Sequence, residues 1–106
     1  MLAKRHRLSR RDVETLKLAG NKKKIQNALL IYLDIGDPVR FGVSISKKVV
    51  RNAVDRNRIR RQIFARIRLH PAYCNGKSAK SVLIKLQKNL ADSSEFDTLI
   101  ENVFEI

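Results

Sequence analysis

Cationic side chains are concentrated in residues 47–61, on both sides of the start of a predicted helix. Guanidinium groups make forked contacts to phosphate oxygens and to base edges. The first turn of a helix adds backbone N–H groups and the positive end of the helix dipole. A solvated basic surface is the simpler interpretation, but the pattern favours a polyanion-binding segment, with nucleic acid as the first candidate. The candidate side chains are Lys47, Lys48, Arg51, Arg56, Asn57, Arg58, Arg60 and Arg61.

Residues that could support catalysis by the protein itself are sparse. His6 and His70 lie far apart in the sequence, and Cys74 is the only cysteine, so the chain does not offer a full set of His and Cys zinc ligands. The four glycines form neither a P-loop nor a dinucleotide-binding fingerprint. The carboxylates of residues 95–105 fall on one predicted helix and are interpreted as its solvated side. We therefore predict no catalytic residue and no metal site formed by this chain alone.

The net charge of +13, from 23 Lys and Arg against 10 Asp and Glu in 106 residues, is unevenly distributed. Residues 1–24 carry a net +7 and residues 47–68 a net +8, while the remainder is close to neutral. Such segregation favours a surface that binds a nucleic-acid backbone over a generally solubilising charge. The length fits one domain, here residues 1–106, and we expect that domain to bind RNA.

Membrane insertion and secretion are not expected. No apolar run approaches the ~20 residues that span a bilayer, and the basic N-terminal residues are not followed by the apolar core of a signal peptide. We expect a cytoplasmic protein without a membrane partner.

The hydrophobic periodicity predicts an α+β domain. In chain order the predicted elements are helix 9–19, a short strand 24–26, strands 28–35 and 39–46, helix 52–69, strand 81–86 and helix 95–104. Strands 28–35 and 39–46 are expected to form a β-hairpin. Ser9 and Ser94 are the predicted N-caps of the first and last helices.

The long predicted helix carries an apolar stripe that should face the sheet. Ile59, Ile63 and Ile67 recur every four residues. Arg56 and Arg60 fall within the same arc of the helix, so a plain amphipathic helix does not account for them. We expect them to reach past the sheet edge or toward a ligand.

The segment from Arg40 to Lys48, followed by Ala53 to Arg61, closely resembles the signature of the bacterial ribonuclease P protein component. The resemblance implies a single-domain αβββαβα two-layer sandwich of the ribosomal protein S5 domain 2-like type, with an unusual left-handed βαβ crossover. It also implies that the catalytic centre lies in an RNA subunit that uses Mg²⁺ to remove the 5′ leader of precursor tRNA. The missing active site would then be expected.

Two RNA-binding surfaces follow from this resemblance. The basic residues listed above match the segment that faces the catalytic RNA. A second surface, the leader cleft between the first helix and the sheet, is matched by Val13, Lys17, Tyr32, Ser44 and Ser46. Many relatives place phenylalanines on this first helix, where this chain has Val13 and, near the second position, Leu16, Lys17 and Leu18.

The expected partners are the ribonuclease P RNA subunit and precursor tRNA, without an obligate protein partner. Three alternatives remain open at this point. A ribosomal or RNA-chaperone protein would not prefer leader-bearing precursors. A protein-only nuclease would need metal-binding carboxylates. A basic peripheral membrane protein is disfavoured, because the isoleucine stripe suits packing against a sheet.

Overall fold

The computed structural model describes residues 6–35, 39–74, 80–90 and 92–105. Within these ranges the elements follow the predicted αβββαβα order, with one short helix added before the last strand. They are α1 (Arg10–Ala19), β1 (Asn21–Lys24), β2 (Ala28–Leu33), β3 (Phe41–Ile45), α2 (Ala53–Leu69), α3 (Pro71–Cys74), β4 (Ser81–Leu86) and α4 (Ser93–Phe104). The short first strand begins earlier than predicted, at residues 21–24.

The strands form one sheet in the order β1-β2-β4-β3. Strand β2 pairs antiparallel with both β1 and β4, and β3 pairs parallel with β4. The predicted hairpin of strands 28–35 and 39–46 is therefore wrong, because β4 lies between them. The hairpin is formed by β1 and β2 instead. The turn expected for the predicted hairpin, residues 36–38, lies outside the described residues.

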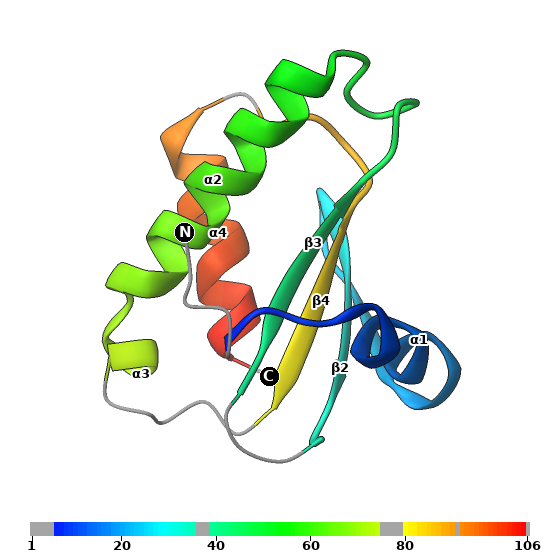
Figure 1. Ribbon diagram of the computed structural model, residues 1–106. Coiled ribbons are helices and arrows are strands. Elements are labelled where there is room, and N and C mark those ends of the chain that lie inside the picture. Colours follow the sequence, from blue (N-terminus) through cyan, green and yellow to red (C-terminus); the bar gives the residue numbers. More distant parts are fainter. Residues whose placement is uncertain (1–5, 36–38, 75–79, 91, 106) are drawn as a thin grey trace.

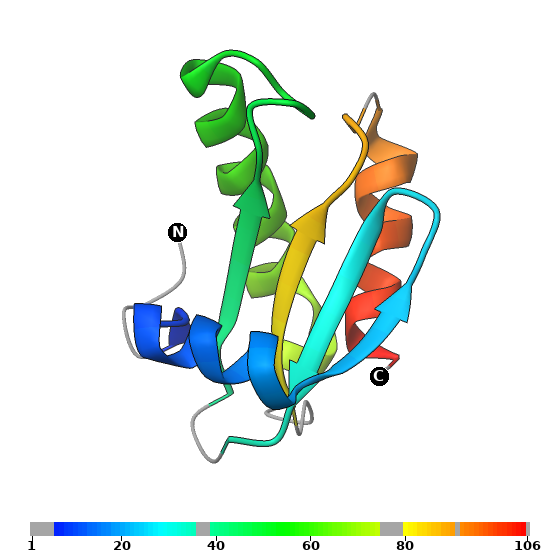
Figure 2. The same ribbon diagram turned by 90° about the vertical axis from the view of Figure 1, so that its right-hand side faces the viewer.

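Strand β4 takes a central position because its side chains are apolar on both faces. Val82, Leu83 and Ile84 are each at most 2% exposed, which is typical of a strand covered on both sides. Helix α2, with α3 after it, carries the chain from β3 to the parallel strand β4. Seen from the α1 side with both strands pointing up, β4 lies to the right of β3 and α2 lies behind (Figure 2). The crossover is left-handed, the uncommon sense that the resemblance implies.

Helices α2 and α4 cover one face of the sheet, named here the two-helix face (Figure 1). The predicted stripe of Ile59, Ile63 and Ile67 is confirmed, since all three side chains are buried there. They pack with Phe41 and Val82 in the larger of two core clusters. This cluster contains most of the buried side chains, so it supplies most of the packing. Truncating a fully buried isoleucine such as Ile63 typically costs about 2–5 kcal/mol.

Helix α1 crosses the opposite face, named here the α1 face (Figure 2). Leu16 packs on Ile31 and Leu83 in the smaller core cluster. The helix ends at Gly20, whose N–H donates to the Leu16 carbonyl at 2.8 Å. A Cβ at Gly20 would lie 2.5 Å from that carbonyl oxygen and 2.8 Å from Ile31 Cγ2. The lack of a side chain therefore lets α1 end close against β2.

The helix caps follow sequence rules, with one difference from the prediction. Ser9 caps α1, as predicted, and the structure adds a reciprocal capping box with Asp12. Helix α4 is capped by Asp92, whose side chain accepts from the Glu95 N–H at 3.1 Å. The predicted cap, Ser94, lies within the first turn and donates its hydroxyl to Asp92. Both residue types cap well, and the earlier carboxylate takes the position.

Candidate nucleic-acid interface

The turn before α2 holds the predicted basic segment in a fixed shape. The N–H groups of Val49 and Val50 both donate to the Ser46 carbonyl at 3.1 Å, and the Val50 side chain is buried. Arg56 is half-buried, and its Nη1 donates to the carbonyls of Val50 at 3.0 Å and Arg51 at 2.8 Å. This explains why Arg56 lies in the apolar arc of the helix, since its guanidinium group closes the turn.

The remaining cations of this segment are more accessible. The side chains that are exposed, as a phosphate-binding surface requires, are Lys47, Lys48, Arg51, Asn57, Arg58 and Arg61. Arg58 forms an exposed ion pair with Asp55 at 3.2 Å, a contact that contributes less than about 1 kcal/mol. Such a pair exchanges readily for a phosphate. Arg60 is half-buried and donates to the Asn57 side-chain oxygen at 3.0 Å.

A groove of about 400 Å³ lies beside β3 and joins this segment to the α1 face. Arg60 of α2 lines one part of it, and Val13 of α1 and Ser44 of β3 line other parts. The Leu8 N–H donates to the Phe41 carbonyl at 2.9 Å, so the chain before α1 runs along the start of β3. The two predicted surfaces are therefore contiguous, and Arg60 belongs to their junction.

The structure brings together most of the predicted leader-cleft residues, but not Tyr32. Ser44 faces the α1 side because Phe41, Val43 and Ile45 pack into the opposite cluster. Lys17 is exposed one helical turn beyond Val13, on the same side of α1. Ser46 is exposed just after β3 ends.

Tyr32 lies on the two-helix face, where it packs against the larger core cluster. The Lys80 ammonium lies 5.2 Å from its ring centroid. The prediction that Tyr32 and Ser44 lie in one cleft is therefore wrong, because the two side chains are on opposite faces of the sheet. The chain's six aromatic residues all belong to, or pack against, this same cluster: Tyr32, Phe41, Phe64, Tyr73, Phe96 and Phe104. Phe41 and Phe64 also line the groove beside β3, but they are only 0% and 4% exposed, so the α1 face offers no exposed aromatic ring on which a base could stack.

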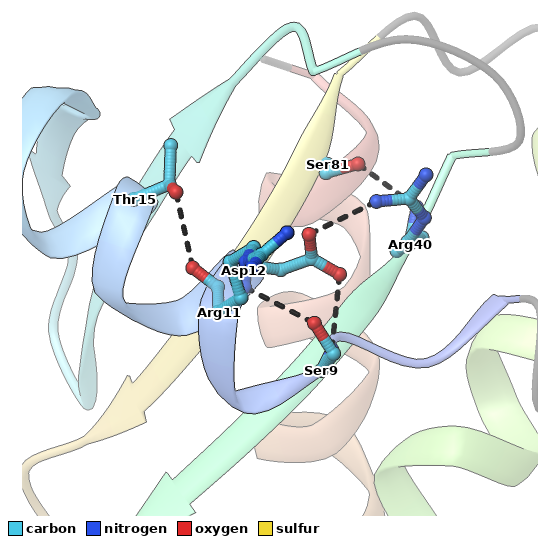
Figure 3. A network of polar contacts seen from close by, with 6 residues as sticks. All are labelled: Ser9, Arg11, Asp12, Thr15, Arg40 and Ser81. Carbon is cyan, nitrogen blue, oxygen red and sulfur yellow. Dashed lines mark hydrogen bonds and ion pairs between the residues drawn. The ribbon is translucent and has the colours of Figure 1, made fainter.

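An ion pair fixes the start of α1 relative to the sheet (Figure 3). Arg40, just before β3, donates to Asp12 Oδ1 at 3.0 Å, while the other Asp12 oxygen accepts from the Ser9 N–H at 3.0 Å. The Arg40 N–H donates to the Ser81 hydroxyl at 2.9 Å and so ties the same residue to β4. Sequence reasoning found the cap at Ser9 but missed the contact of Arg40 with Asp12, because only the fold brings Arg40 near α1.

The Asp12 carboxyl is held in its charged form. Burial acts to raise its pKa, but the hydrogen bonds from Ser9 and the positive charge of Arg40 together outweigh burial. The pKa of Asp12 therefore lies below its ordinary value of 3.8.

Side chains suited to catalysis are not gathered in the described part of the chain. His6 lies 3.0 Å from the Val39 carbonyl through Nδ1, and His70 lies 3.1 Å from Glu101 through Nε2. No group of three or more His, Cys, Asp or Glu side chains among the described residues could hold a metal ion. No helix in the same ranges is both long enough and apolar enough to cross a membrane.

Known proteins resemble this chain in sequence and in fold. The sequence model of the Ribonuclease P family matches residues 2–105. The ribonuclease P protein component of Microcystis aeruginosa is 45% identical over 69 residues, which cover 59% of this chain and 58% of that protein. The corresponding component of Gluconacetobacter diazotrophicus is 38% identical over 73 residues, covering 65% and 61%. The matched region thus spans about 60% of the length of these two relatives.

A solved structure of the Staphylococcus aureus RNase P protein superimposes with a TM-score of 0.76. It is 23% identical and covers 94% of this chain and 93% of that chain, so the likeness shows a shared fold. The family's sequence model covers nearly all of the residues that build this fold. The chain therefore belongs to the ribonuclease P protein family.

Proposed function

We propose that this chain is the protein subunit of a ribonucleoprotein ribonuclease P, an endonuclease that removes the 5′ leader of precursor tRNA. In this proposal the protein binds the catalytic RNA and the leader and positions one against the other. Phosphodiester hydrolysis takes place in the RNA. A cytoplasmic location is part of the same proposal.

The exposed cations of residues 47–61 are the observation that carries the proposal. They lie on a turn that Arg56 holds in place and on the first turns of α2. The buried isoleucine stripe of α2 anchors this helix on the sheet, so the charged surface is presented on a rigid support. Such a surface suits the phosphates of a folded RNA, which position a protein without reading sequence.

The groove beside β3 supports the proposed placement of the leader. It runs between α1 and α2, so a single strand lying in it would pass from Arg60 to Val13 and Ser44. Apolar residues form most of its lining, with Arg7, Arg60 and Ser44 as charged or polar members. A lining with so few hydrogen-bonding side chains suits a leader of variable sequence. Tyr32 is left out of this site because its side chain lies on the other face of the sheet.

The proposed magnesium ions belong to the RNA. The described residues contain no carboxylate cluster that fits a metal ion. What this chain supplies is positive charge near the bound phosphates. That charge lowers the concentration of Mg²⁺ that the RNA needs for folding and substrate binding.

The test is cleavage of precursor tRNA by the protein, by a bacterial ribonuclease P RNA, and by both together across a Mg²⁺ titration. We expect no cleavage by protein alone, and cleavage by the combination at lower Mg²⁺ than by RNA alone. Metal-dependent cleavage by the purified protein, abolished by Asp→Asn or Glu→Gln variants, would contradict the proposal. Equal binding of precursor and mature tRNA would favour a general RNA chaperone.

A further inference from the structure

The register of the sheet places two lysines in one row with Ser44 on the α1 face. Lys24 of β1 pairs with Leu29 of β2, Leu29 pairs with Lys85 of β4, and Lys85 pairs with Ser44 of β3. Residues that pair across a sheet point to the same face. Because Ser44 faces the α1 side, Lys24 and Lys85 do as well.

This row is open to solvent. Lys24 and Lys85 are exposed, and Leu29 and Ser44 are half-buried. The next row contains Lys22, Ile31 and Leu83, and Leu16 of α1 packs on its two apolar members. Helix α1 therefore covers one row and leaves the other beside it, toward the end of β3 (Figure 2).

Lys85 is an unusual residue for its position. It is the exposed member of β4, whose other side chains are all buried, and β4 is an inner strand of the sheet. A lysine there places its charge over the middle of the open face. Carboxylates that pair with arginines include Asp12, Asp55 and Asp97, and none of these three pairs with Lys24 or Lys85.

The row continues the groove beside β3. Ser44 lines that groove and is also the first member of the row. Neighbouring strands are about 4.8 Å apart, so the row extends about 14 Å from Ser44 to Lys24. A polyanion leaving the groove would thus meet Lys85 and then Lys24.

We propose that Lys24 and Lys85 bind the phosphates of the distal part of the leader, beyond the nucleotides held in the groove. This inference rests on the proposed function and adds to it a path and a mode of binding. Because the α1 face carries no exposed aromatic ring, the path holds RNA through charge and not through base stacking. Binding there is independent of leader sequence and depends on leader length and on salt.

The experiment uses the protein reconstituted with a bacterial ribonuclease P RNA and precursor tRNAs with progressively longer leaders. The variant is Lys24→Gln/Lys85→Gln. The matched control is Lys23→Gln/Lys80→Gln, which removes the same charge. Lys23 lies next to Lys24 but pairs with Leu30 of the two-helix face, and Lys80 lies over Tyr32 on that face.

We expect the wild-type protein and the control to bind precursors more tightly as the leader lengthens, up to a plateau. The variant should reach its plateau at a shorter leader and bind short-leader precursors as the wild type does. Affinity for long-leader precursors falls as salt rises, and each phosphate contact adds ~0.7 to the slope of log affinity against log salt. With two contacts removed, the fall between roughly 50 and 200 mM salt should be about sevenfold smaller for the variant than for the wild type.

Three outcomes would overturn the inference. The variant and the wild type could show the same dependence on leader length, in which case the lysines only solvate the sheet. The variant could lose affinity equally for every leader length, or the control could lose as much as the variant. Failure of the proposed function is distinguishable, because the wild type itself would then show no preference for leader-bearing tRNA.

Discussion

The Asp12–Arg40 ion pair gives the sharpest prediction about stability. The two side chains are 16% and 26% exposed, so the pair is more shielded from solvent than an ordinary surface pair. Asp12→Asn removes the charge from an acceptor of two hydrogen bonds, one from Arg40 and one from the Ser9 N–H. Hydrogen bonds to charged groups contribute about 1.5–3 kcal/mol, and an amide oxygen retains part of that. We expect a loss of about 1–3 kcal/mol in the free energy of unfolding.

The loss should depend on pH in a defined direction. The pKa of Asp12 is lower in the folded chain than its ordinary value of 3.8. A carboxyl of this kind stabilises the fold above its unfolded pKa, and the contribution disappears as pH falls through the lowered folded pKa. The difference between wild type and Asp12→Asn should therefore be constant near neutral pH and shrink below about pH 4. The pKa of Asp92 is also lowered, but Asp92 is present in both proteins and cancels.

Urea unfolding followed by far-UV circular dichroism measures these differences. A double-mutant cycle with Arg40→Gln isolates the pairwise term, because the Arg40 contact to Ser81 uses its backbone N–H and survives the substitution. Glu14→Gln, which neutralises an exposed carboxylate on the same helix, is the control and should change stability by less than about 0.5 kcal/mol. A coupling energy below about 0.5 kcal/mol, or a pH-independent difference down to pH 3, would refute the reasoning.

Two further predictions separate the RNA-binding surfaces. Arg58→Ala/Arg61→Ala should leave the free energy of unfolding unchanged, because both side chains are exposed. It should weaken assembly with the catalytic RNA and lower the slope of log affinity against log salt by about 0.9 per contact. Filter binding measures both, and normal assembly would remove these residues from the interface. Tyr32→Ala should cost about 1–3 kcal/mol of stability, less than a fully buried aromatic, and leave leader affinity of the folded protein unchanged. A selective loss of leader affinity at unaltered stability would return Tyr32 to the leader site.

Local sequence signals predicted the helices well and the strand order poorly. Ser9, Gly20 and the isoleucine stripe act through neighbouring turns of the chain, so their consequences can be read from spacing alone. Strands β2 and β3 were expected to pair because they are adjacent in sequence. Their true neighbour, β4, comes 35 residues or more after β3 ends. No residue pattern within β2 or β3 identifies β4 as the partner. The signal lies in β4 itself, whose apolar residues on both faces indicate an inner strand.

The candidate site also has a part that could be predicted from local sequence and a part that could not. The basic segment could be predicted because its charge density and its position at a helix start are local properties. The composition of the α1 face could not, because it depends on which residues of four strands share a face. Strand alternation places Tyr32 with Leu30, on the face opposite Ile31, but no sequence signal relates that alternation to the alternation of β3.

The pairing register also decides what kind of RNA contact each face can make. It gathers the aromatic residues into the larger core cluster and sends Lys24 and Lys85 to the α1 face. A one-residue shift of β2 against β4, with β1 still paired to β2, would move Lys24 to the two-helix face and bring Lys23 to the α1 face. Because Leu30 is fully buried on the two-helix face while Leu29 is only half-buried, the core itself resists that shift in β2. The same packing that stabilises the fold therefore fixes a charged, non-aromatic surface beside α1.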